Sequence, residues 1–474
     1  MWQLDGMNPI YNLVLGVIAV SLAMAVMVLL VLRHRAYRRW LNYSPRQNAV
    51  ARFRGDVVQA LPINATAGGW VMPDTANGAV SGFLEVDARA TVMGRFCDPW
   101  IELVARGFYD VQFLERGVCG VRFLNITRLL AAGVAPGETI ELRGHDVALR
   151  LEFARLHLSR EMLQASDRVI IIAPHPDDAE IMAFGLYTDT GATVVNITTG
   201  DASDRYRSSG RLAMRVPRAT VARVRVWDSI TIPQLFGVKP EQAVNLCYSD
   251  GCLAEMRLQP ERDFRGDGAD ALDFEGLRQL NRSTLAREGA KCTWVSLVRD
   301  LEHILAATRP TIIVMPHPLL DPHPDHMATT AAVAEALRGA GLGDGRFLFY
   351  CTHNRRSELW PFGPAGSGVP LLPLLESDGP CSDGFYSHVL SAERQTEKFL
   401  ALEAMHDVRD MAWPVASPTE GAGRRLCAEL RAMAHGMGRT PLNYFRQAVR
   451  PDELFLTASF ANGLELCARA GGCG

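Results

Sequence analysis

The chain has 474 residues, of which 48% are hydrophobic and 21% are charged, and its formal net charge is −3. This length accommodates two or three domains, and the composition excludes a largely disordered chain. The slightly negative charge offers no basic field of the kind that nucleic-acid-binding proteins use, so we expect no nucleic acid as a partner.

The first predicted element is an apolar helix near the N-terminus. The twenty residues from Leu13 to Leu32 carry no charge, and a helix of about this length crosses a ~30 Å hydrocarbon core. Four arginines lie in the seven positions after this run, whereas one aspartate is the only charged residue before it. A secretory signal has the opposite order of charge, and flanking arginines favour the cytoplasmic side. We therefore predict a single-pass membrane anchor over residues 10–32 with the rest of the chain in the cytoplasm. A buried core helix is the alternative.

Residues 45–165 contain short stretches in which apolar and polar residues alternate, separated by turns that contain glycine. These stretches are 81–94, 99–117, 119–127 and 138–158. Such alternation is typical of antiparallel strands with one buried face. We therefore predict a β-rich, sandwich-like accessory domain over residues 45–165. Two roles stay open for it, a glycan-binding or docking module and a spacer that packs on the neighbouring domain.

From residue 166 onward the pattern changes to strands that alternate with helices. Near-continuous apolar runs at 168–173, 193–200 and 311–317 are typical of strands buried on both faces. This order predicts an α/β domain over residues 166–460, with a Rossmann-like, mostly parallel sheet that helices cover on both faces. In such sheets the loops at the carboxyl ends of the strands form the functional site.

Two clusters of histidine and carboxylate residues follow strands of this predicted sheet. The first lies in APHPDDAE, after the first strand, and the second lies in HPLLDPHPDH, after the strand near residue 315. The residues concerned are His175, Asp177, Asp178, Glu180, His317, Asp321, His323, Asp325 and His326. Either cluster alone could be a capped turn at a helix N-terminus. Two of them at equivalent strand ends favour a metal site built from imidazole and carboxylate groups.

Three of these residues are candidate metal ligands. Zinc in catalytic sites has three protein ligands and keeps the fourth position for water. His175 and Asp178 are separated by three positions across a strand-to-helix turn and can converge on one ion, and His326 can complete the set. Zinc is the expected cofactor, and Fe²⁺ or another divalent cation suits the same ligands.

The other residues of the clusters have predicted roles in proton transfer. Asp177 can accept a proton from water as the general base. His323 can donate a hydrogen bond to a developing oxyanion or a proton to a leaving amine. Asp325 can fix the tautomer of His323 by accepting from its other ring N–H. We predict these three as the catalytic residues.

The two motifs closely resemble those of the PIG-L-like (LmbE-like) zinc-dependent N-acetylglucosaminyl de-N-acetylases, over about residues 168–410. The resemblance implies the same ligands, base and oxyanion-stabilising histidine as above. It also implies two substrate-binding residues. CYSDGCL is similar to a Y-x-D-G-x-L segment of the family, which implies Asp250 as an acceptor for a sugar hydroxyl. RVWD is the nearest counterpart of an R-x-x-E helix near the substrate, which implies Arg225. The stretch 253–290 has no counterpart in the family.

These features together predict a membrane-anchored, zinc-dependent N-deacetylase. Its reaction is removal of the N-acetyl group from a GlcNAc-containing glycan or glycoconjugate, with release of acetate. The predicted anchor points to a lipid-linked glycan, so the expected partner is an N-acetylated sugar or glycolipid. Two alternatives stay open. The same site could act as an amidase or esterase on another acyl substrate, because metal and base do not select the acyl group. The chain could also be a catalytically inert glycan-binding membrane protein.

Overall fold

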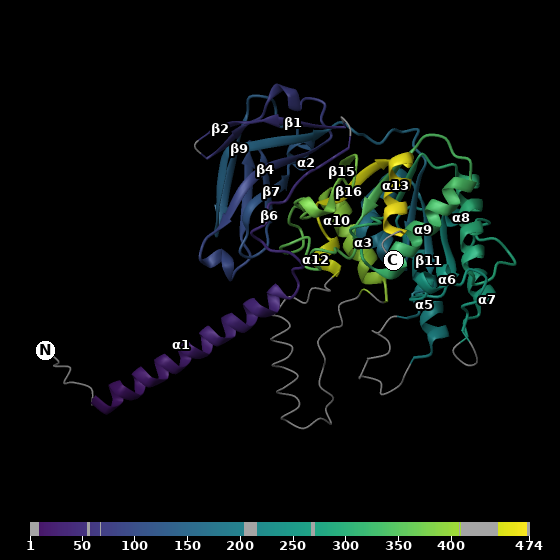
Figure 1. Ribbon diagram of the computed structural model, residues 1–474, viewed down its shortest axis with the longest axis horizontal. Helices are drawn as coiled ribbons and strands as arrows, with labels where there is room; N and C mark the ends of the chain where they lie inside the picture. Colours follow the sequence, from purple (N-terminus) through teal and green to yellow (C-terminus); the bar gives the residue numbers. More distant parts are fainter. Residues whose placement is uncertain are drawn as a thin grey trace.

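The computed structural model describes residues 9–54, 57–66, 68–202, 216–266, 271–406, 408 and 444–471. Three parts follow one another along this chain: an N-terminal helix, a pair of antiparallel sheets and an α/β body (Figure 1). Figure 1 shows helix α1 projecting away from the other two parts, which lie side by side.

Helix α1 (Pro9–Arg38) contains the apolar run that predicted a membrane anchor. Large apolar side chains along it are exposed, among them Leu13 at 68% and Leu22 at 65%. It is therefore not the buried core helix of the alternative prediction. Within the described residues, however, no helix has the length and apolarity required to cross a bilayer. The predicted transmembrane anchor over residues 10–32 is thus not supported, and the cytoplasmic placement derived from it stays a prediction.

The antiparallel part consists of two sheets that pack on a common apolar core. Among the described residues, one sheet has the strand order β1-β9-β4-β7 and the other has the order β2-β3-β8-β5-β6. Trp70, Leu84, Ile101 and Leu156 are fully buried between them. This arrangement accords with the alternating pattern of the sequence. The strands are β1 (Val58–Pro62), β2 (Asn64–Thr66), β3 (Gly69–Val71), β4 (Ser81–Ala90), β5 (Trp100–Ala105), β6 (Phe108–Phe113), β7 (Cys119–Asn125), β8 (Thr139–His145) and β9 (Val147–Ser159).

The body is built on a mixed sheet with the described strand order β12-β11-β10-β13-β14-β16-β15. β10 pairs in parallel with β11 and β13, and β12 and β14 extend this parallel set. β16 is antiparallel to both β14 and β15. The strands are β10 (Val169–Ala173), β11 (Thr193–Thr198), β12 (Ala243–Tyr248), β13 (Ile312–Pro316), β14 (Arg346–Tyr350), β15 (Gly384–Val389) and β16 (Asp452–Ser459).

Helices cover both faces of this sheet. Side chains alternate between the two faces along a strand. Ile170 and Ile172 accordingly pack in one apolar cluster with α5, α8 and α9, whereas Ile171 packs in another with α3 and α10. The helices are α3 (Asp178–Thr190), α5 (Arg218–Leu235), α6 (Leu253–Leu258), α7 (Phe274–Arg278), α8 (Trp294–Thr308), α9 (Pro324–Gly339), α10 (Ala392–Ala404), α12 (Tyr444–Ala448) and α13 (Phe460–Gly471), with α2 (Thr127–Ala131) in the accessory part.

Helix α3 is kinked, and a buried ion pair supports the kink. Ala183 has the non-helical torsion angles φ −141° and ψ 22°. The Glu453 carboxylate of β16 accepts hydrogen bonds from the backbone N–H groups of Gly185 at 2.9 Å and Leu186 at 3.0 Å. Lys398 of α10 donates to the same carboxylate at 2.7 Å, and both charged side chains are buried. This network holds α3, which begins at the first polar cluster, against β16 and α10.

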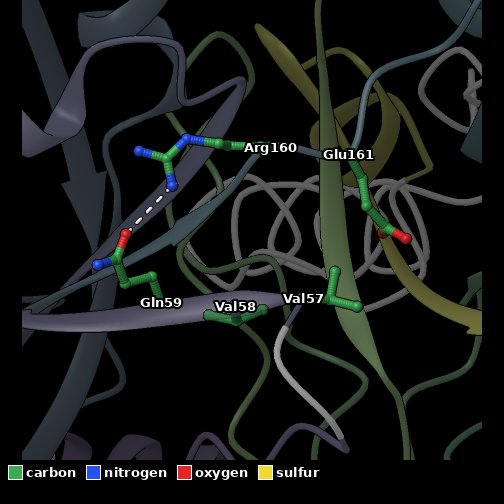
Figure 2. Close-up of a pocket in the computed structure, with 5 residues that line it drawn as sticks. All are labelled: Val57, Val58, Gln59, Arg160 and Glu161. Carbon is green, nitrogen blue, oxygen red and sulfur yellow. Dashed lines mark hydrogen bonds between the residues drawn. The ribbon is translucent and has the colours of Figure 1, made fainter.

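The segment after β9 connects the accessory sheets to the body and is held on both sides. Arg160 donates to the Gln59 side chain of β1 at 3.1 Å. The neighbouring Glu161 accepts from the Thr457 hydroxyl of β16 at 2.6 Å. Figure 2 shows these two side chains pointing apart at a pocket beside β1. The predicted domain boundaries at residues 45, 165 and 460 stay predictions.

Candidate active site

The two polar clusters lie at the same edge of the body sheet. β10 leads into the loop that contains His175, and β13 leads into the loop that precedes His326. Because the carboxyl ends of neighbouring parallel strands meet at one edge, residues 151 positions apart come into contact there.

Three atoms from the two clusters form a small triangle. Nδ1 of His175 lies 3.3 Å from Oδ2 of Asp178 and 3.2 Å from Nε2 of His326. The remaining side, from Asp178 Oδ2 to His326 Nε2, is 3.2 Å. Tetrahedral bonds of about 2.0–2.1 Å to one ion separate ligand atoms by about 3.3 Å. His323 also offers a nitrogen within 4.8 Å of the other two histidines, but the closer triangle that includes Asp178 fits one ion better.

The second ring nitrogen of His326 is held by a carboxylate. His326 Nδ1 lies 2.9 Å from Oδ2 of Asp321. Because a carboxylate only accepts, this nitrogen carries the proton and Nε2 is left to face the triangle. Asp321 Oδ2 also accepts from the backbone N–H groups of Thr352 at 3.1 Å and His353 at 3.2 Å. The sequence placed Asp321 in the second cluster without a role; the structure shows that it orients His326.

His175 is oriented in the same way by carboxylates. Its Nε2 lies 3.2 Å from Oδ1 of Asp250 and 3.4 Å from Oδ2 of Asp325, which leaves Nδ1 for the triangle. Oδ2 of Asp250 accepts from the backbone N–H of Ala202 at 3.1 Å. Asp250 therefore orients His175, and its role as an acceptor for a sugar hydroxyl stays a prediction.

The carboxylates make this site strongly attractive to positive charge. Burial opposes ionisation of His326, but Asp178 and Asp321 raise the pKa of its ring to about 10. Burial likewise opposes ionisation of His175, while neighbouring carboxylates, Asp250 first, raise its pKa well above the ordinary value. The site therefore favours positive charge between these groups, either as protons on the two rings or as a bound cation. The two nitrogens and one oxygen of the triangle suit zinc or iron(II).

Thr352 completes the support of the triangle. Its hydroxyl donates to Oδ1 of Asp178 at 2.8 Å, so the other oxygen of that carboxylate is held toward the two histidines. Thr352 follows β14, and no pattern in the sequence pointed to it, since a single threonine after a strand carries no signal of its own.

Asp177 lies next to this triangle and is paired with Arg225. The guanidinium donates to Oδ2 of Asp177 at 2.9 Å and to the carbonyl oxygens of Gly200 at 2.8 Å and Pro176 at 3.2 Å. Gly200 has a φ of +67°, and a Cβ there would lie 2.3 Å from the guanidinium. Arg225 is only 4% exposed. These buried contacts position Asp177, and the predicted role of Arg225 in binding substrate stays a prediction.

His323 precedes α9, and its ring contacts those of His175, His326 and His353, with the centroid of His326 at 4.8 Å. The centroid of the His323 ring lies 4.9 Å from that of His175, edge-on, and 5.1 Å from that of His353, stacked. The backbone N–H of Asp325 donates to its Nδ1 at 3.3 Å, so Nε2 carries the proton. The Asp325 carboxylate instead accepts from the N–H of Gly251 at 2.7 Å and faces His175. The prediction that this carboxylate fixes the tautomer of His323 is therefore wrong, because the start of α9 turns it toward the other loop.

The comparison with known families bears on this geometry. Residues 170–337, which contain both clusters, match the PIG-L family, described as GlcNAc-PI de-N-acetylase. We refer to residues 170–337 as the PIG-L segment. The resemblance found in the motifs is thereby confirmed, and it supports the chemistry of a metal-dependent de-N-acetylase for the PIG-L segment. Among curated proteins, none matches the chain significantly.

Several solved structures are similar to part of the chain. The A40926 pseudoaglycone deacetylase is 17% identical, over 61% of this chain and 97% of its own, with a TM-score of 0.30. A deacetylase of teicoplanin biosynthesis, in complex with teicoplanin, is 15% identical over 62% and 98%, with a TM-score of 0.28. The 4-carboxy-2-hydroxymuconate hydratase from Pseudomonas putida KT2440 is 13% identical over 62% and 95%, with a TM-score of 0.31.

Proposed function

We propose that the PIG-L segment is a zinc-dependent N-deacetylase that removes the acetyl group from a GlcNAc-containing glycan and releases acetate. The observation that carries the proposal is the triangle of His175, Asp178 and His326. Asp177 directly precedes Asp178 in the chain, and the ring of His323 contacts that of His175. We assign the first three as metal ligands. The choice of GlcNAc rests on the description of the family.

The residues of the chain divide the work of amide hydrolysis. A bound divalent ion supplies Lewis acidity and lowers the pKa of its water toward about 7. Asp177, held by Arg225, accepts the proton from the attacking water. His323, with its proton on Nε2, donates a hydrogen bond to the acetamide oxygen as negative charge develops there. The proton on Asp177 is then available to the amine as the C–N bond breaks, so that acetate and the free amine leave.

The test is acetate release by the full chain from several acyl substrates. The panel contains GlcNAc, N,N′-diacetylchitobiose, an N-acetylated amino acid and an acetate ester, with metal content measured by mass spectrometry. We expect acetate from the sugars, loss of turnover with a chelator and recovery with added Zn²⁺. Turnover of the amino acid or the ester alone would replace the proposal by an amidase or esterase. Full activity in metal-free protein would refute the ligand assignment.

Lipid linkage of the glycan was predicted from the N-terminal run and is not part of this proposal. Adding a detergent-solubilised GlcNAc glycolipid to the same panel tests whether the enzyme prefers a lipid-linked substrate. A preference for the glycolipid over chitobiose would extend the substrate class, and equal rates would confine it to the sugar.

A further inference from the structure

The outer face of the four-stranded accessory sheet carries a groove that the deacetylase site does not involve. It crosses strands β9, β4 and β7, which lie side by side in Figure 1. Its volume is about 420 Å³, within the range of about 300–1,000 Å³ typical of small-molecule sites. The side chains that matter here are Glu85, Asp87, Arg89, Arg150, Glu152 and Phe153.

A bulge in β9 gives this groove its exposed aromatic ring. Glu85 of β4 pairs with Arg155 of β9, and Asp87, two residues on, pairs with Arg150. Two steps along β4 therefore correspond to five along β9, so β9 carries three extra residues. Phe153 lies in this bulge and is 88% exposed. Bulges commonly redirect side chains at functional sites, and an aromatic ring so exposed is costly to keep in water.

The polar side chains around the ring are accessible. Within the described part of the chain, the side chains of Arg150 and Glu152 form no hydrogen bond or ion pair, and both residues are exposed. Asp87 and Arg89 pair at 3.2 Å on the surface, with side chains 31% and 49% exposed. Three carboxylates face two guanidinium groups in the groove, so its charge is nearly balanced. Such a surface favours a neutral ligand that is rich in hydrogen-bonding groups over an anion or a cation.

We propose that this groove binds a neutral oligosaccharide. The C–H face of a pyranose ring provides an apolar surface on which the exposed ring of Phe153 can pack. The hydroxyl groups of the sugar both donate and accept hydrogen bonds. Arg150 can donate to them and Glu152 can accept from them. The three carboxylates would repel an anion, and the two arginines would repel a cation.

The groove lies on the face of this sheet that points away from the other accessory sheet. Another part of the same face contacts the body. Side chains two residues apart share a face of a strand, so Phe83 lies on the same face as Glu85 and Asp87. The ring of Phe83 packs edge-on against Phe385 of β15, at 4.7 Å between centroids. A saccharide in the groove therefore lies beside the domain that we propose to deacetylate glycans. The binding proposal stands without that activity, because the groove shares no residue with the metal triangle.

The test is calorimetric titration of the full chain with chitotriose, cellotriose and maltotriose. We expect binding of at least one, little affected by salt, and a loss of about tenfold or more in Phe153→Ala. Tyr109→Ala is the matched control, because Tyr109 is an aromatic residue 57% exposed on β6 of the other sheet. Asp177→Asn should bind the trisaccharide as the wild type does, and Phe153→Ala should keep wild-type turnover of GlcNAc.

Several outcomes would overturn the proposal. One is no binding of any of the three sugars, and another is equal binding by wild type and Phe153→Ala. Binding restricted to sulfated saccharides and lost at high salt would show an anion site. Self-association that Phe153→Ala abolishes, without any sugar binding, would show a contact between copies of the chain. Wild-type protein that binds the sugar but shows no deacetylase activity would leave the groove proposal standing and refute the proposed function alone.

Discussion

Charged side chains cluster both at the strand ends of the body and on the outer face of the accessory sheet. At the strand ends they are held by partners, whereas on the accessory sheet they are accessible to solvent. At the strand ends, His326 is held by Asp321, His175 by Asp250, and Asp177 by Arg225. On the accessory sheet, Arg150 and Glu152 face solvent. Chemistry needs groups fixed within a fraction of an ångström, whereas a binding surface needs groups that are free to meet a ligand. The difference indicates fixed geometry in one region and accessibility in the other.

The largest expected effect is on turnover, from a change at the proposed general base, Asp177. In Asp177→Asn the side chain keeps its size but can no longer accept the proton, so kcat should fall by about 10²–10⁴. Metal content should stay at the wild-type level, because the triangle does not include Asp177. Acetate release and mass spectrometry measure both. Asp344→Asn, at an exposed site in the same domain, is the control, and unchanged turnover in Asp177→Asn would assign the base elsewhere.

The buried ion pair behind α3 should give the largest effect on stability. Lys398→Met leaves Glu453 as an unpaired buried charge, which should lower the free energy of unfolding by about 3–5 kcal/mol. Urea unfolding measures it, with the exposed Lys291→Met as the control. The double variant Lys398→Met/Glu453→Gln should lose less than the sum of the two single variants. Strict additivity would contradict direct pairing.

Orientation of a ligand should matter less than its presence. Asp321→Asn removes the negative charge that holds His326 and should weaken metal binding by about 10–100-fold. Competition with a chelator of known affinity gives the constant. At saturating metal, much of the turnover should return. A metal affinity equal to that of the wild type would show that Asp321 is only a structural neighbour.

Asp452 should make stability depend on pH. Burial and the nearby Asp110 raise the pKa of this carboxyl to about 8. Because this folded-state pKa exceeds the unfolded value of about 4, the stabilising contribution is complete below pH 4 and is lost as pH rises to about 8. Urea midpoints measured from pH 5 to 8 should fall with pH in the wild type. Asp452→Asn should flatten that slope, and an unaltered slope would place the titrating group elsewhere.

The smallest effect is expected on the accessory face. Phe153→Ala removes a side chain that is 88% exposed, so the free energy of unfolding should change by less than about 0.5 kcal/mol. Thermal and urea unfolding measure it. A larger loss would show that the ring is part of the core and would remove the contrast between the two regions.

Much of the body could be predicted because its signals are local. The apolar run at 311–317 and the helical segment after it correspond to β13 and α9. His175, Asp178 and His326 were singled out from two short motifs and do lie together. The apolar N-terminal run illustrates the opposite case. Its composition alone predicted a transmembrane span that the structure does not support.

The sequence by itself determined the alternation of strands and helices and the types of side chain at two strand ends, because periodicity and turn residues act over a few positions. Only the tertiary structure decided which carboxylate meets which histidine. Asp325 turns to His175, 150 residues away, and Asp321 turns to His326. Arg225 is buried against Asp177, 48 positions away in the chain. Such pairings depend on which strands, far apart in the chain, end at the same edge of the sheet. Local sequence patterns span only a few residues and do not predict these long-range contacts.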